Sequence, residues 1–125
     1  MAVPILKQGP FLIASIQAAL TDTDVLRLQE DVMVQVGRFR SRGIVGDVTA
    51  LDVMDSFVSR SLRSIAHMTR LRGAETVIVG IQPEVAFAMV QLGMNFEDVH
   101  TALDLEEGLA FLQDKVSGEP GGGGG

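Results

Sequence analysis

The sequence contains no cysteine among its 125 residues. This absence excludes disulfide bonds, thiolate metal sites and cysteine nucleophiles, and it is typical of a cytoplasmic protein. Every apolar run is shorter than the ~18 residues that a membrane-spanning helix needs. The amino terminus reads "MAVPILKQGP", without a basic segment followed by a long apolar one. We therefore expect neither a secretory signal nor a membrane span.

A marked excess of basic residues is also missing, because the formal net charge is −6. Residues 1–73 carry nine Lys or Arg and seven Asp or Glu, whereas residues 74–125 carry one Lys and nine acidic residues. Nucleic-acid-binding proteins usually present a clear basic excess, so we expect no nucleic-acid partner. The uneven distribution suits docking between protein surfaces of opposite sign, and it equally fits a soluble acidic surface.

The signature motifs of common enzyme classes are absent as well. The chain has no P-loop, no G-x-S-x-G nucleophile elbow, no H-E-x-x-H zinc motif and no Gly-rich dinucleotide fingerprint. Its two histidines, His67 and His100, have no acid–base partner at a suitable spacing. We expect a protein that is not an enzyme and that holds no cofactor or metal.

Three aspartates are the one cluster that suggests metal chemistry. Asp47, Asp52 and Asp55 surround the segment after a predicted strand, and three carboxylates are able to hold Mg²⁺. The only lysines, Lys7 and Lys115, lie elsewhere, so a phosphate-transfer site would lack its usual cation. We favour the interpretation that these aspartates accept hydrogen bonds from backbone N–H groups before the next helix.

Hydrophobic periodicity predicts a single α/β domain over residues 1–117, followed by a disordered Gly-rich tail over 118–125. Strand–helix alternation favours a mostly parallel sheet of about four to five strands with helices packed on it. Thr21 to Asp24, Asp104, Gly43 and Gly73 are predicted helix start and stop signals. The predicted strands are 3–7, 11–16, 43–48, 74–81 and 98–102, and the predicted helices are 21–42, 56–71, 83–92 and 104–116.

The helix that begins at Ser56 carries a polar stripe opposite its core face. The stripe contains Ser56, Arg60, Arg63, His67 and Arg70, at the spacing of one helical face. Ser56 is well placed to be the N-cap, which stabilises a helix by ~1 kcal/mol. A phosphoryl group on Ser56 would equally suit the positive end of the helix dipole, with Arg60 one turn away. The residues alone do not choose between these two roles.

Several segments resemble the STAS domains of stressosome proteins of the RsbS and RsbR type. The segment "DVTALDVMDSF" resembles the phosphorylation-site region of that family, and "RGAETVIVGIQPEVAFAMVQLG" and "TALDLEEGLAFL" are similar to later parts. The resemblance covers about residues 3–113. It implies a non-catalytic scaffold that self-associates with RsbR-type paralogues in a large complex and sequesters an RsbT-like serine kinase.

The same resemblance implies how the scaffold is switched. The kinase would phosphorylate Ser56 and be released, and an RsbX-like phosphatase would reset the serine. Ser59 ranks lower as the phosphoacceptor, because it lies within the first turn of the helix. A kinase or partner surface is expected to include Asp55, Arg60, Arg63 and Arg70.

Phe57 is a departure from simple anti-sigma-factor antagonists, in which a second small hydroxyl residue and a glycine tend to follow the serine. It favours the scaffold subfamily over the alternative, an antagonist that binds an anti-sigma kinase in a pairwise partner switch. A third possibility from another class is an enzyme or receiver that uses the aspartate cluster with Mg²⁺. Phosphoserine and aspartyl phosphate differ in acid stability, so the label itself distinguishes them.

Overall fold

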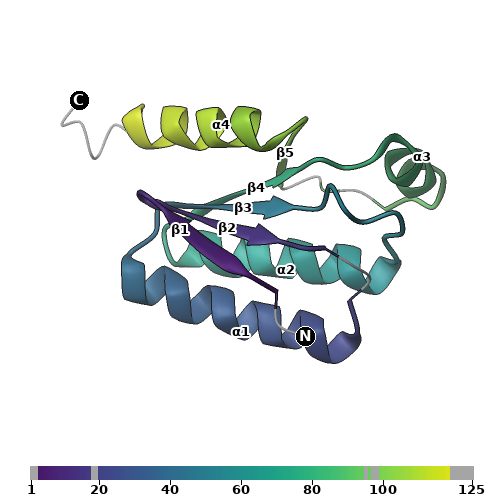
Figure 1. Cartoon of the computed structure of the whole chain (residues 1–125), viewed down its shortest axis with the longest axis horizontal. Coiled ribbons are helices and arrows are strands. Elements are labelled where there is room, and N and C mark those ends of the chain that lie inside the picture. Colours follow the sequence, from purple (N-terminus) through teal and green to yellow (C-terminus); the bar gives the residue numbers. More distant parts are fainter. Residues whose placement is uncertain (1–2, 18–19, 95, 97–98, 119–125) are drawn as a thin grey trace.

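The computed structural model describes residues 3–17, 20–94, 96 and 99–118. Over these residues the chain forms five strands and four helices (Figure 1). Their bounds are β1 Ile5–Gln8, β2 Phe11–Ser15, α1 Asp22–Phe39, β3 Gly43–Asp47, α2 Ser56–Leu71, β4 Glu75–Val79, α3 Pro83–Gln91, β5 His100–Ala102 and α4 Leu105–Ser117. The predicted α/β architecture is confirmed. Residues 119–125 of the predicted tail lie outside the described residues.

The five strands form one sheet in the order β1-β2-β3-β4-β5. β1 and β2 are antiparallel across the turn at Gly9, whose φ is +61°, as the Gly-Pro signal predicts. The other neighbouring pairs are parallel. Because β2 to β5 point the same way, the loops that follow them gather at one end of the sheet. We call this end the carboxyl edge and the opposite end the amino edge.

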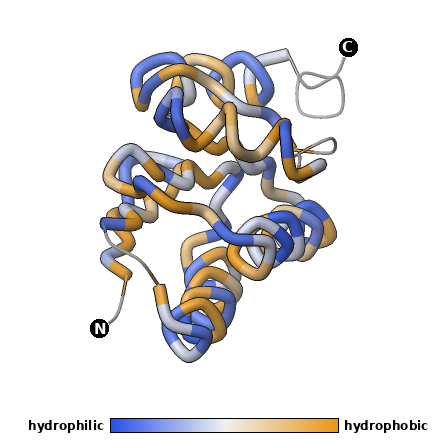
Figure 2. The backbone as a smooth tube through the Cα atoms, turned by 90° about the vertical axis from the view of Figure 1, so that its right-hand side faces the viewer, coloured by the Kyte–Doolittle hydropathy of each residue, from blue (hydrophilic) through white to orange (hydrophobic). Residues whose placement is uncertain are grey.

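Helices α1 and α2 cover one face of the sheet and α4 covers the other (Figure 1). Successive residues of the central strands therefore contribute to two cores. Ile44 and Ile78 lie in the larger core under α1 and α2, whereas Val45 and Val77 lie in the smaller core under α4. Figure 2 shows hydrophobic and hydrophilic positions interspersed along the helices, as expected for helices with one buried face.

Helix α1 begins as predicted and ends earlier than predicted. Thr21 is its N-cap and forms a capping box with Asp24, and the hydrogen bond from the Thr21 N–H lowers the pKa of the Asp24 carboxyl. The expected stop at Gly43 is wrong, because Arg40 is the C-cap, with a φ of +51°. Gly43 instead opens β3, where a Cβ would lie 2.9 Å from the Leu112 methyl groups of α4. This glycine lets α4 approach the sheet.

Two buried threonines link α2 to β4. The hydroxyls of Thr69 and Thr76 lie 2.8 Å apart, and Thr69 Oγ1 also donates to the Ala66 carbonyl at 2.9 Å. Both residues are buried. Because Thr69 donates its hydroxyl proton to the Ala66 carbonyl, the Thr76 hydroxyl donates to Thr69 and depends on it for a hydrogen-bond partner. The pair fixes the amino-edge end of α2 against the sheet.

Candidate functional site

The loop between β3 and α2 brings Ser56 to the carboxyl edge. Leu51 and Met54 are buried in the larger core, and the Leu51 N–H donates to the Val48 carbonyl at 2.9 Å. Asp52 and Val53 lie between these two anchors and are exposed. Because the loop is pinned on both sides of its exposed tip, the start of α2 has a defined position.

A second set of contacts ties this loop to the turn after β4. Asp47 Oδ1 accepts hydrogen bonds from the Thr49 N–H at 3.0 Å and from Thr49 Oγ1 at 2.6 Å. Gln82 Nε2 donates to the Thr49 carbonyl at 2.7 Å. Gly80 has a φ of +79°, and a Cβ built there would overlap Thr49 Oγ1. We call these four residues, Asp47, Thr49, Gly80 and Gln82, the loop latch.

Asp55, and not Ser56, is the N-cap of α2. The Val58 N–H donates to Asp55 Oδ1 at 2.8 Å, and the Ser59 N–H donates to the Asp55 carbonyl at 3.0 Å. The expectation that Ser56 caps the helix is therefore wrong. Asp55 has an extended backbone, and its carboxylate accepts the hydrogen bond from the Val58 N–H at position N3 of the helix. Ser56 is therefore the first helical residue.

Ser56 and Ser59 differ in their access to solvent. Ser56 is exposed, and within the described part of the chain its hydroxyl makes no hydrogen bond. Ser59 is only 3% exposed and lies on the core side of α2. The Ser56 side chain is therefore accessible in the folded domain, whereas the Ser59 side chain is covered.

The polar stripe of α2 divides into two ends. Ser56, Arg60 and the cap residue Asp55 are exposed together near the carboxyl edge. Arg63 is half-buried, and its Nε is buried without a hydrogen-bond partner in the described structure. Arg70 lies at the other end of the helix, with its Nη2 3.7 Å from Glu75 Oε1. Since a helix rises ~1.5 Å per residue, Arg70 is ~20 Å from Ser56 and does not belong to its immediate site.

Of the three aspartates flagged in the sequence, Asp47 and Asp55 accept hydrogen bonds from backbone N–H groups as we favoured, whereas Asp52 is exposed and accepts none in the described structure. Asp47 accepts from the Thr49 N–H and Asp55 from the Val58 N–H. Among the described residues, no group of three His, Cys, Asp or Glu side chains is arranged to hold a metal ion. His100 stacks on Phe111 of α4, with ring centroids 3.6 Å apart, and His67 is exposed.

Sequence reasoning did not identify the loop latch. It singled out the segment after β3 through its aspartates, but Thr49 and its partner Gln82 are 33 residues apart. The available signal was Gly80, since a glycine between a strand and a proline-started helix marks a turn of special geometry.

No helix in the described ranges combines the length and apolar character that a bilayer span requires.

Comparisons with known proteins agree on one family. Residues 2–108 match the STAS domain. The RsbT co-antagonist protein RsbRD of Bacillus subtilis is 32% identical over 87 residues, which are 70% of this chain and 31% of that protein. RsbRA of the same organism is 31% identical over 83 residues, 66% of this chain and 30% of that protein. The chain thus spans about a third of the length of these curated relatives.

Solved structures extend the likeness to whole domains. A serine-to-glutamate variant of RsbS from Moorella thermoacetica superposes with a TM-score of 0.79 at 32% identity, covering 92% of this chain and 97% of that one. A chain from a structure of the stressosome, described as a signal integration and transduction hub, gives a TM-score of 0.74 at 32% identity. It covers 90% of this chain and 98% of that chain.

Proposed function

This chain belongs to the STAS domain family, and on that premise we propose that it is a non-catalytic, cytoplasmic stressosome scaffold of the RsbS type. It sequesters an RsbT-like serine kinase and releases it when Ser56 is phosphorylated. RsbR-type paralogues are its co-assembly partners, and an RsbX-like phosphatase resets the serine. The likeness to RsbS over nearly the whole domain supports this proposal.

The exposed Ser56 hydroxyl is the observation that carries the proposal. Asp55 provides the side-chain cap of α2, so the Ser56 hydroxyl has no structural task that phosphorylation would interrupt. Leu51 and Met54 anchor the preceding loop, and Gln82 ties that loop to the turn after β4. A kinase therefore meets a serine at a fixed position, on a scaffold that does not depend on it.

A phosphoryl group at Ser56 would change the local charge strongly. It adds ≈ −1.5 to −2 charges at the first helical residue, where backbone N–H groups and the helix dipole favour an anion. Arg60, one turn along, is the nearest cation on the stripe and is exposed. Asp52 and Asp55 oppose the new charge. A partner docked on Asp55, Arg60, Arg63 and the stripe towards Arg70 would meet a different surface, which explains release of the kinase.

Labelling by the cognate serine kinase tests the site. We expect Ser56→Ala to abolish labelling and to retain the kinase in a pull-down, and we expect Ser56→Asp to release it incompletely. Ser59→Ala is the matched control, because it removes a serine from the same turn of α2. Phosphopeptide mass spectrometry identifies the modified residue. Full labelling of Ser56→Ala, or an acid-labile label on Asp47, Asp52 or Asp55, would contradict the proposal.

Particle size separates the scaffold from the pairwise antagonist. A scaffold should co-elute with RsbR-type paralogues in a particle far larger than two domains, whereas an antagonist should form a small complex with its kinase. Phe57, which stands where simple antagonists tend to have a small hydroxyl residue, packs against the larger core. Size-exclusion chromatography with light scattering, on the co-expressed proteins, gives the mass. A complex of two or three chains would favour the antagonist.

A further inference from the structure

Positive charge collects at the amino edge. Helices α1, α2 and α4 all start near the carboxyl edge and run back, so their last turns and C-caps share this end (Figure 1). Two carboxylates also lie there, Glu75 and Asp114. We call the cationic residues the basic edge: Arg38, Arg40, Arg42, Arg70, Arg72 and Lys115. These are six of the ten Lys and Arg residues of the chain.

Negative charge collects at the carboxyl edge for the same topological reason. Each helix that starts there has an acidic residue at its N-cap or in its first turn, which complements the positive end of its helix dipole. We call four of these residues, at the starts of α3 and α4, the acidic edge: Glu84, Asp104, Glu106 and Glu107. Asp52 and Asp55 are left out, because they stand beside Ser56 on the surface proposed for the kinase, where Arg60 is also exposed. The domain is thus electrically polar along the direction of its strands.

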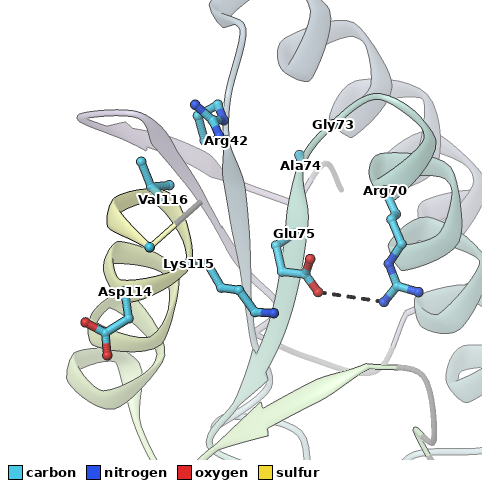
Figure 3. A pocket seen from close by; sticks show the side chains of 9 residues that line it. Arg42, Arg70, Gly73, Ala74, Glu75, Asp114, Lys115 and Val116 are labelled. Atoms are coloured by element: carbon cyan, nitrogen blue, oxygen red, sulfur yellow. Dashed lines mark ion pairs between the residues drawn. The ribbon is translucent and has the colours of Figure 1, made fainter. Parts of the chain in front are cut away.

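The basic edge is hollowed. A pocket of about 410 Å³ lies between the ends of α2 and α4, with Arg42, Arg70 and Lys115 among its lining residues. Figure 3 shows Arg70 and Lys115 reaching toward Glu75 from opposite sides. Three of its five charged lining residues are cationic, and the other two are Glu75 and Asp114.

Each edge also presents an exposed apolar side chain next to charges of one sign. On the basic edge Leu71 is 87% exposed and stands between Arg70 and Arg72. On the acidic edge Leu103 is 77% exposed beside Asp104. An apolar centre within a charged rim is the usual composition of a protein–protein contact. The two edges thus have the same composition, an exposed apolar side chain with charged neighbours, and their charges are opposite in sign.

We propose that the basic edge of one copy docks onto the acidic edge of a second copy, head to tail. Charge complementarity selects this occupant, since the chain itself supplies the matching acidic surface. Such a contact is heterologous: each copy uses a different surface on either side, so repetition gives rings, closed particles or filaments. The inference rests on the proposed scaffold function, because it names the surfaces through which STAS domains would assemble.

Charge reversal on the full chain tests the contact. The basic-edge variant carries Arg38→Glu and Arg72→Glu, and the acidic-edge variant carries Glu84→Lys and Glu106→Lys. None of these four side chains caps a helix. Glu30→Lys, in the middle of α1, is the control for an added positive charge outside both edges. Sedimentation velocity at about 50 mM and 500 mM salt measures association, because the Debye length shortens from more than 10 Å to a few ångströms.

We expect the wild type and Glu30→Lys to associate at low salt and to dissociate at high salt. Each double variant alone should associate roughly tenfold more weakly or worse, because like charges then meet. An equimolar mixture of the two double variants should recover association, since each reversed edge finds a reversed partner. A wild type that stays monomeric at high concentration and low salt overturns the proposal, as does association that both reversals leave unchanged or a mixture that does not recover.

The two proposals fail separately. Kinase labelling of Ser56 in the basic-edge variant reports on the switch, since the substituted residues lie at the opposite end of the sheet. If Ser56 is labelled but association does not depend on salt, only the head-to-tail contact is refuted. If the protein associates as expected but Ser56 is not labelled, only the assigned phosphorylation site is refuted.

Discussion

Replacement of Asp55 and replacement of Ser56 should have very different effects on stability. Asp55 Oδ1 accepts from the Val58 N–H at 2.8 Å, so Asp55→Ala leaves one N-terminal donor of α2 without its side-chain partner. Loss of such a cap costs about 1 kcal/mol, within a range of about 0.5–2 kcal/mol. Loss of the carboxylate next to the helix dipole adds about 0.3–1 kcal/mol. We therefore expect Asp55→Ala to lower the free energy of unfolding by roughly 1.3–2 kcal/mol.

Ser56→Ala should change that free energy by no more than about 0.5 kcal/mol. Ser56 is exposed and is the first residue of the helix, so its hydroxyl contributes no cap. Alanine also has the higher intrinsic helix propensity. Asp55→Asn is the matched control, because it keeps an oxygen acceptor and removes only the charge, and its cost should be about half that of Asp55→Ala.

Urea unfolding followed by circular dichroism measures these differences, and the melting temperature gives a second reading. A change of 1 kcal/mol shifts the melting temperature of a domain of this size by roughly 4 °C. If Ser56→Ala were as destabilising as Asp55→Ala, Ser56 would be the cap and the geometry of the site would be wrong. The expected result also matters for the proposed function, because Ser56→Ala would then test phosphorylation in a domain whose fold is intact.

Three further substitutions test the latch and the two cores, each by urea unfolding. Gly80→Ala should cost more than about 3 kcal/mol, because a Cβ overlaps Thr49 at a φ of +79°, whereas Gly93→Ala, at a φ of +72° in open space, should cost about 1–2 kcal/mol. Similar costs would argue against the latch. Thr69→Val should cost about 1–3 kcal/mol by leaving the buried hydroxyl of residue 76 unpaired, and adding Thr76→Val should restore part of that loss. An additive double variant would exclude the hydroxyl pair. Leu112→Ala should cost about 2–5 kcal/mol, because this side chain is fully buried under α4, and a smaller loss would mean that α4 packs loosely.

Local signals predicted the helices and strands well, because the hydrophobic periodicity and the capping residues of an element lie within or next to its own sequence. Thr21 and Asp104 cap α1 and α4 as expected, and both accept from the backbone N–H three residues on. The errors occurred where two residues offered the same local signal. Aspartate and serine are both favourable N-cap residues, and the neighbouring sequence does not determine whether Asp55 or Ser56 caps α2. The choice depends on where the buried side chains of Leu51 and Met54 place the chain.

Gly43 shows the same limit in another form. A glycine after an amphipathic stretch predicts a helix end, but this glycine is needed for the approach of Leu112, some seventy residues later. Gly80 and Gln82 likewise act on Thr49 in a different loop. Local patterns encode helices and strands, whereas contacts between loops at the carboxyl edge depend on the assembled sheet. The exact shape of the candidate site therefore required the structure.

Chain direction connects the switch and the docking surface. In a parallel sheet every crossover helix starts at the carboxyl edge, so acidic helix starts and Ser56 gather there while basic last turns gather at the other end. A phosphoryl group on Ser56 would add negative charge beside the acidic edge. It should then strengthen head-to-tail docking onto Arg38 and Arg72 of a neighbour while it repels a kinase that reads Asp55 and Arg60. On this reasoning, phosphorylation releases the kinase from an assembly that stays intact or tightens, and a particle that falls apart on Ser56 phosphorylation would contradict it.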